Sequence, residues 1–236
     1  MDVHARGPLS DSLSCSAAQE DAAKLFAFVA KTFGDKLHVL VNCAAGNFLA
    51  LPEELSTNGF KTVMDIDAVG TFNMCRAAHP MLRAARGAVV INISATLHYG
   101  STWYQTHACA AKAAVDAMTR SLALEWGAHG IRVCGVAPGP IAGTAGMAKL
   151  APGGEGALQA VVAEIPLGRM GTKTDIAYAC IFLASPAAAF VSGDTLVVDG
   201  AAWIYRTPVA PRTAIGALAR KVEGTSRAVG LAKAKL

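Results

Sequence analysis

The sequence predicts an α/β fold with a doubly wound parallel sheet, and three observations support this. Short segments rich in Val, Ile and Leu alternate with longer segments of helical spacing along most of the 236 residues. The short segments are apolar at nearly every position, which is typical of strands buried on both faces. The chain is 53% hydrophobic and only 16% charged, which suits a sheet enclosed between helix layers better than a sandwich with one wet face.

The expected elements follow one another in a regular order. A first helix should end at Gly34, because glycine is a usual helix stop. Residues 1–200 should form one domain, and residues 201–236 a tail to which no strand is assigned. The segments are a helix over 17–33, a strand within 37–46, a helix over 58–85, a strand over 88–94, a helix over 105–126, a strand over 131–139, an irregular Gly/Ala-rich stretch over 141–163, a helix over 174–183 and a strand over 194–200.

Composition excludes several classes of function. The net charge is +4, but Lys and Arg are scattered and form no basic stripe interleaved with aromatics, so no nucleic-acid partner is expected. A modest positive field favours small molecules that carry phosphate. The 6 cysteines lie singly without metal-ligand spacing, so neither structural zinc nor a disulfide framework is expected. No apolar run approaches the roughly 18 residues of a membrane span, and no secretory signal is expected.

Four segments together resemble the short-chain dehydrogenase/reductase family over residues 1–200. They are the turn NCAAG (42–46), the strand VINIS (90–94), the helix that carries Lys112, and the loop that begins at Pro138-Gly139 and includes Thr144. The resemblance implies a Rossmann-type sheet and a nicotinamide cofactor. The segments CAAGNF (43–48), MDID (64–67), SAT (94–96), AAKAAVDAMTR (110–120) and PGPIAGT (138–144) are most similar to the peroxisomal 2,4-dienoyl-CoA reductase branch.

That branch reduces 2,4-dienoyl-CoA to trans-3-enoyl-CoA with NADPH, in the oxidation of polyunsaturated fatty acids. The resemblance therefore implies NADP(H) as cofactor and an acyl-CoA as substrate. Two alternatives stay open from the sequence. One is a 3-oxoacyl or hydroxyacyl reductase of the same family, and the other is a non-catalytic fragment that assembles with an intact paralogue.

Three positions depart together from the usual pattern of the family. Ala108 stands where the family has its catalytic tyrosine, Ala95 where it has a serine, and Asp67 where it has an asparagine. Lys112 is retained, and the resemblance implies that it binds the nicotinamide ribose and supplies positive charge. Alternatively, Lys112 is a surface lysine whose stem packs on the helix.

The chemistry explains how a dienoyl-CoA reductase can do without the tyrosine. A 2,4-dienoyl thioester takes hydride at C5, and the proton is added at the α-carbon, far from the hydride. The resemblance implies that Asp67 delivers this proton through a water. Alternatively, Asp67 only binds a backbone amide or pairs with Lys112. Tyr99 and Tyr104 are the rival proton donors.

The resemblance also assigns the cofactor and substrate residues. Glycine in the turn allows close approach of the cofactor ring, and a lysine suits the CoA phosphates. An equally open interpretation of residues 56–58 is a helix N-cap. The cofactor residues are Asp2, Asn42, Ala44, Gly46, Lys112, Pro138, Gly139, Pro140, Ile141, Gly143 and Thr144, and the substrate residues are Asn47, Phe48, Ser56, Thr57, Asn58 and Lys149.

The two ends of the chain carry the last expectations. The family's first strand-helix-strand, with its G-x-x-x-G-x-G turn, has no counterpart in this sequence, so we expect a truncated Rossmann domain in which the strand over 37–43 is an exposed edge. The final Ala234-Lys235-Leu236 resembles the tripeptide read by the peroxisomal import receptor. Peroxisomal localisation and a homo-oligomer, a tetramer built through the two long helices, are therefore expected.

Overall fold

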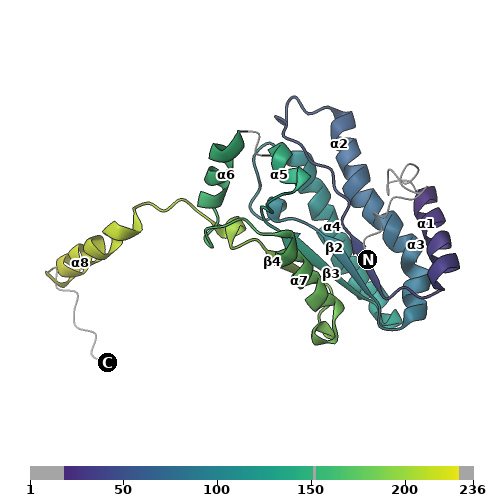
Figure 1. Cartoon of the computed structure of the whole chain (residues 1–236). Helices are drawn as coiled ribbons and strands as arrows, with labels where there is room; N and C mark the ends of the chain where they lie inside the picture. Colours follow the sequence, from purple (N-terminus) through teal and green to yellow (C-terminus); the bar gives the residue numbers. More distant parts are fainter. Residues whose placement is uncertain (1–18, 151–152, 229–236) are drawn as a thin grey trace. The chain divides into compact units, whose positions relative to one another are not determined.

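The computed structural model describes residues 19–150 and 153–228. The chain divides into two compact units, residues 1–204 and 205–236, and each is described by itself. The first unit is built on a four-stranded sheet in the order β1-β2-β3-β4, with every neighbouring pair parallel (Figure 1). The parallel α/β class predicted from the sequence is confirmed. The strands are β1 (Val39–Asn42), β2 (Val89–Ile93), β3 (Arg132–Pro138) and β4 (Thr195–Val198).

Helices cover both faces of this sheet, as a doubly wound fold requires. On one face α1 (Gln19–Phe33), α3 (Gly70–Ala85) and α4 (Thr106–Trp126) pack against Leu40, Val90 and Val133. On the other face α7 (Lys173–Ala184) packs against Val89, Ile91, Cys134 and Val136. Successive strand residues therefore enter opposite cores, which explains why the strand segments are apolar at nearly every position.

The predicted long helix over 58–85 is present but contains an irregular turn. It consists of α2 (Thr57–Met64), the π-helical turn η1 (Asp65–Val69) and α3. In the π turn the N–H of Gly70 donates to the carbonyl of Asp65, five residues earlier. A π turn adds one residue to the helix, changes the faces on which side chains emerge, and occurs frequently at functional sites. Here it places Asp67 in the interior, 1% exposed.

The expectation of an irregular stretch over 141–163 is wrong, and the tail, to which no strand was assigned, contains a helix. The Gly/Ala-rich stretch contains the helices α5 (Ala145–Leu150) and α6 (Gly154–Ala163), because its alanines favour helix and its glycines fall largely at the helix ends. The tail contains α8 (Arg212–Ala228), which the prolines at 208 and 211 do not prevent because both precede it. No residue of α5 or α6 is fully buried, so both helices lack the strongly buried face of α3 or α4.

Strand β1 lies at the edge of the four-stranded sheet, as expected. Within residues 19–150 and 153–228 it is hydrogen-bonded to β2 alone, and Val39 and Val41 are 40% and 45% exposed. The expectations for Asp2 and for Ala234-Lys235-Leu236 fall outside the described residues. Among the helices of the described segments, none is both long and apolar enough to cross a membrane.

Candidate active site

The candidate site lies where the parallel strands reach their carboxyl ends, the usual location of ligands in doubly wound sheets. Two buried charges meet there. Lys112 on α4 places Nζ 3.0 Å from Oδ2 of Asp67, with the two side chains 8% and 0% exposed. The same ammonium donates to the carbonyl of Ile93 at the end of β2, at 3.0 Å. Lys112 is therefore buried and fixed between a helix and a strand, which excludes the alternative of a surface lysine.

Asp67 is held on its other side by the turn after β1. Its Oδ1 accepts the backbone N–H of Gly46 at 2.6 Å. A Cβ at Gly46 would lie 3.2 Å from Cδ1 of Ile66, so this turn packs closely on the π turn. Both contacts named as the structural alternative for Asp67, a backbone amide and Lys112, are thus present. They fix the carboxylate in place and leave its role in proton delivery a proposal.

The contact between Lys112 and Oδ2 of Asp67 is an ion pair without the alignment of a hydrogen bond, so Oδ2 has no well-placed donor. Other buried polar atoms nearby also lack partners within the described residues. A buried unpartnered group of this kind costs about 1–3 kcal/mol, so each one calls for an explanation. The neighbouring atoms are Oδ1 of Asn47, Oγ of Ser94, and both ring nitrogens of His107.

The positions of the absent family residues are filled by alanine. Ala108 is 1% exposed on α4, four residues before Lys112, and Ala95 is an extended residue at the N-cap of the short 3-10 turn Thr96–His98. Neither offers a proton. His107, next to Ala108 on the first turn of α4, is fully buried, and sequence reasoning missed it. The available signal was a histidine directly beside the substituted tyrosine position.

Tyr99 forms its hydrogen bond with Asp116 and not with a residue of the candidate site. Its hydroxyl donates to Oδ2 of Asp116 at 3.0 Å, and its ring packs edge-on against Trp203. Burial, together with the charge of Asp116, raises the pKa of Tyr99 to about 12. His98 contacts the same carboxylate oxygen at 3.0 Å. Tyr99 is therefore a protonated phenol whose hydrogen is already committed. Tyr104, the second rival, is 47% exposed on the loop before α4.

The predicted cofactor residues line the ends of β1 and β3. The side chain of Asn42 points into the protein and donates to Asn92 at 2.9 Å, so its backbone is what remains for a ligand. Ala44 is exposed and Gly46 half-buried. At Gly139 an added Cβ would lie 2.5 Å from Cβ of Asp199, so only glycine allows this approach of β3 and β4. Thr144 caps its own turn through Ile141 and Met147. Pro138, Pro140 and Ile141 are half-buried and Gly143 is exposed.

The predicted substrate residues fall into two groups. Asn47 and Phe48 adjoin the site: Asn47 donates to Gln105 at 2.6 Å, and the ring of Phe48 lies on that of His107. Ser56, Thr57 and Asn58 are exposed, and Ser56 caps α2 by accepting the N–H of Gly59 at 3.0 Å, so the N-cap interpretation is present in the structure. Lys149 is exposed on α5.

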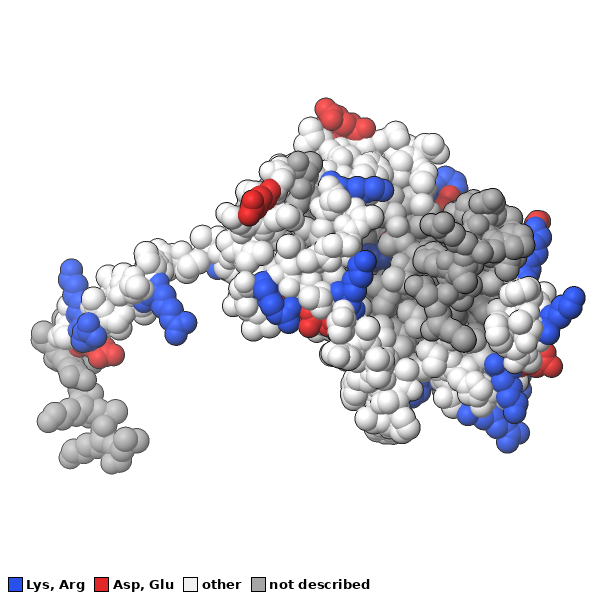
Figure 2. All heavy atoms as spheres, viewed as in Figure 1, with Lys and Arg blue, Asp and Glu red and all other residues white. Residues whose placement is uncertain are grey.

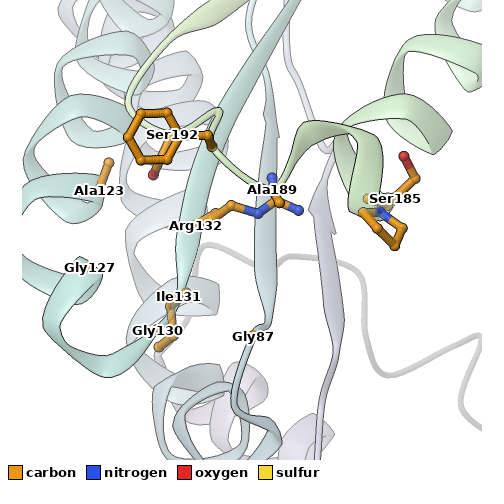
Figure 3. Close-up of a pocket in the computed structure, with 12 residues that line it drawn as sticks. Gly87, Ala123, Gly127, Gly130, Ile131, Arg132, Ser185, Ala189 and Ser192 are labelled. Atoms are coloured by element: carbon orange, nitrogen blue, oxygen red, sulfur yellow. The ribbon is translucent and has the colours of Figure 1, made fainter.

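A hollow in the described part of the chain lies elsewhere. It is lined by Gly87, Ile131 and Arg132 at the amino ends of β2 and β3, and by Ala123 and Ser192 among others (Figure 3). The Arg132 guanidinium within it is bonded to the carbonyls of Leu183 and Val191 at 2.7 and 3.2 Å. None of the described residues that line this hollow has a buried polar side-chain atom without a partner. We therefore place the candidate site at the carboxyl ends of the strands. On the face shown in Figure 2, Lys and Arg occupy several separate places.

Comparison with known proteins identifies the family to which the chain belongs. The model of the family described as Enoyl-(Acyl carrier protein) reductase matches residues 5–201. A short-chain dehydrogenase from Bacillus anthracis, whose structure was solved, superposes with a TM-score of 0.72 at 35% identity, covering 82% of this chain and 75% of that one. The chain belongs to the short-chain dehydrogenase/reductase family, as the resemblance implied.

Two curated relatives narrow the comparison. A protein of Arabidopsis thaliana named peroxisomal 2,4-dienoyl-CoA reductase, (3E)-enoyl-CoA-producing, is 52% identical over 229 residues, which are 92% of this chain and 76% of that protein. A protein of Pongo abelii with the same name is 51% identical over 174 residues. That match covers 74% of this chain and 59% of the Pongo protein, so the chain spans less than two thirds of this relative's length.

Proposed function

We propose that this chain is an NADP(H)-dependent reductase that converts 2,4-dienoyl-CoA to trans-3-enoyl-CoA. The observation that carries the proposal is the buried Asp67–Lys112 pair at the carboxyl ends of the strands, beside an alanine at position 108. A carbonyl reductase of this family needs a side-chain hydroxyl that donates a proton next to the site of hydride transfer, and Ala108 has no such group. A dienoyl thioester needs its proton at the α-carbon instead. The names of the two relatives agree with this chemistry.

The residues at the site fit a nicotinamide cofactor. Lys112 carries a buried ammonium group with N–H donors, and the turn that contains Gly46 is exposed at Ala44, where a flat ring can approach. Asn42, Ala44, Gly46 and Lys112 would hold the nicotinamide and its ribose, and residues 138–144 the carboxamide. The bound cofactor would supply a hydride to C5 of the dienoyl chain. The choice of NADP(H) over NAD(H) rests on the family resemblance. Measuring turnover with NADPH and with NADH tests this choice.

The chain's own residues would then manage charge and proton. As hydride adds to C5, the electron pairs of both double bonds shift toward the thioester, and negative charge accumulates on its oxygen. Lys112 supplies the compact positive charge that stabilises this oxygen. Oδ2 of Asp67, which lacks an aligned donor, would hold a water whose proton goes to the α-carbon, while Gly46 keeps the carboxylate oriented. The remaining double bond then lies between C3 and C4.

One observation favours a second candidate function, that of a partner subunit without turnover. Strand β1 is an edge of the described sheet, with Val39 and Val41 40% and 45% exposed. An exposed apolar edge readily pairs with another chain. A titration of the chain alone with NADPH separates the two candidates, since a partner subunit predicts no saturable binding by itself.

Assembly and location belong to the same proposal. We propose a homotetramer formed through the α3 and α4 faces, where Phe72 and Leu124 are 43% and 84% exposed. Import into the peroxisome by its receptor, through Ala234-Lys235-Leu236, rests on the terminal tripeptide and on the peroxisomal names of the relatives. Deleting the tripeptide should leave a fluorescent fusion outside peroxisomes. A cytosolic distribution of the intact fusion would remove the location from the proposal.

The experiment that tests the reaction uses the full chain with 2,4-hexadienoyl-CoA and NADPH. Consumption of NADPH that depends on the dienoyl-CoA, with 3-hexenoyl-CoA as product, is the expected result. Turnover of a 3-oxoacyl-CoA that disappears in Tyr99→Phe would instead revive the carbonyl reductase. Saturable NADPH binding without consumption on either substrate would contradict the proposed reaction.

A further inference from the structure

We propose that His107 and Asn47 bind the thioester end of the acyl-CoA, with the His107 imidazole donating to the thioester carbonyl. The inference rests on the proposed function, because it names the ligand of the same site. It begins with an exception to normal packing. His107 is fully buried on the first turn of α4, yet neither ring nitrogen has a hydrogen-bond partner within the described residues. Buried polar groups in folded proteins are nearly always paired, so the imidazole is placed to receive a partner that residues 19–150 and 153–228 do not supply.

The protonation of this imidazole suits a hydrogen-bond donor without charge. Burial lowers the pKa of His107, against smaller raising effects from the carbonyl of Phe48 and the charge of Asp67. At neutral pH the ring is therefore neutral, with one nitrogen that donates and one that accepts. Hydrogen bonding to the Phe48 carbonyl contributes to the pKa of His107, but by distance and angle neither ring nitrogen makes a full hydrogen bond within the described residues. One N–H is thus available to a carbonyl oxygen.

Asn47 offers the complementary group on the adjoining turn. Its Nδ2 donates to Gln105 at 2.6 Å, while its Oδ1 is buried and has no donor among the residues that the structure describes. The two residues therefore present an unused donor and an unused acceptor on one short segment and the helix turn it packs against. An acyl-CoA matches both, because the thioester carbonyl accepts a hydrogen bond and the amides of the adjoining pantetheine arm donate one.

The turn links this pair to the reacting charges. Gly46 bonds Asp67, Asn47 bonds Gln105, and Ala50 donates to the carbonyl of Tyr104 at 2.9 Å, so the segment 46–50 is tied both to the π turn and to the start of α4. A thioester carbonyl held by His107 has the α-carbon as its direct neighbour. That is the carbon that would take its proton from the side of Asp67.

Phe48 covers the imidazole in this structure. The two ring centroids lie 4.3 Å apart with the planes tilted by 32°, and Phe48 itself is 38% exposed on an irregular segment. A thioester reaches the imidazole when this ring turns aside. Substrate binding should therefore change the surroundings of Phe48, and replacing His107 with a ring that also stacks on Phe48 isolates the role of the nitrogens.

The variants follow from that geometry. His107→Phe keeps a ring against Phe48 and removes both nitrogens, and His107→Asn restores a donor and an acceptor. His79→Phe is the matched control, because His79 on α3 also lies against an aromatic ring, that of Trp126, with centroids 4.7 Å apart. We expect His107→Phe to lower kcat/KM for hexadienoyl-CoA by roughly 10- to 100-fold with unchanged NADPH affinity. His107→Asn should recover part of this loss, and His79→Phe should stay near wild type.

A binding measurement separates this inference from the proposed reaction. Wild type should bind hexanoyl-CoA more tightly than S-hexyl-CoA, the thioether without the carbonyl, by roughly 5- to 20-fold, and His107→Phe should bind the two alike. That result supports the inference even if no dienoyl-CoA is reduced. Equal binding of both ligands by wild type, or a preference that survives in His107→Phe, would overturn it. So would a kcat/KM of a folded His107→Phe that equals that of His79→Phe.

Discussion

The two ends of the sheet differ in how their polar groups are satisfied. At the amino ends, a hollow contains Arg132, whose guanidinium is bonded to two backbone carbonyls. At the carboxyl ends, Asp67 and Lys112 are buried, while Asn47 and His107 hold polar atoms that have no partner in the described part of the chain. A protein tolerates the cost of unpartnered buried groups where a ligand supplies the partner. The candidate site is identified by buried polar atoms that lack hydrogen-bond partners, and not by the size of a hollow.

Replacing Lys112 by methionine should have the greatest effect, because Lys112 would bind the cofactor and also neutralises Asp67. We expect kcat/KM to fall at least roughly 1,000-fold. Leaving the Asp67 carboxylate buried and unpaired should also cost about 3–5 kcal/mol of the free energy of unfolding. Turnover, NADPH titration and thermal unfolding measure the three effects. Lys61→Met, which removes the exposed ion pair with Asp65, is the control and should change stability by less than about 1 kcal/mol.

Asp67→Asn separates proton delivery from architecture. An amide oxygen can still accept the N–H of Gly46, so the turn should keep its shape. We expect kcat to fall roughly 100-fold or more while NADPH affinity changes little. Asp65→Asn on the same π turn is the matched control, since Asp65 pairs with the exposed Lys61. Undiminished turnover in Asp67→Asn would remove this carboxylate from the mechanism.

Arg132→Met tests the amino end of the sheet, where the opposite pattern of effects is expected. The guanidinium satisfies the carbonyls of Leu183 and Val191, and charged hydrogen bonds of this kind contribute about 1.5–3 kcal/mol each. The free energy of unfolding should therefore drop by about 2–4 kcal/mol. In a chain kept below its unfolding temperature, kcat/KM should stay within about twofold of wild type. A large loss of turnover with intact folding would show that the two ends are not separate.

Tyr99→Phe should have the smallest effect on turnover and a distinct dependence on pH. The folded pKa of Tyr99, about 12, lies above the ordinary value of 10.0, so the folded protein retains a proton that the unfolded chain loses. Its contribution to stability is complete below pH 10 and is lost as the pH rises toward 12. Wild type should thus lose more thermal stability than Tyr99→Phe across this range. Identical alkaline profiles of the two proteins would contradict the buried hydrogen bond to Asp116.

The sequence predicted the four strands, and it offered the ion pair of Asp67 with Lys112 as one alternative. Successive strand residues enter opposite cores, so four of the five residues of Val89–Ile93 are apolar, and the resemblance implied the role of Lys112. The π turn could not be predicted, because its extra residue leaves no mark in the periodicity of residues 58–85. Helices α5 and α6 have no fully buried residue, and glycines lie in the first turn of each, so the sequence gave only a weak helix signal there.

Contacts between distant segments explain what else was missed at the site. The sequence gives no reason to single out His107, because the ring of Phe48 that lies on it comes from 59 positions earlier in the chain. Tyr99 was a candidate proton donor until its hydroxyl was seen to bond Asp116, and the N-cap role of Ser56 needed the geometry of α2. Residue types and spacing predict which chemistry is possible. Which hydrogen bonds are already made is a property of the folded chain.

The most direct measurement is the position of the new hydrogens when hexadienoyl-CoA is reduced in heavy water. If Asp67 and a water deliver the proton to the α-carbon, the product is 3-hexenoyl-CoA with one deuterium at the α-carbon and none at C5. With NADPH deuterated at its transferable hydrogen, in ordinary water, the label should move to C5. A product with its double bond between C2 and C3 and its solvent deuterium at C4 would contradict protonation at the α-carbon, and so would deuterium from the solvent at C5.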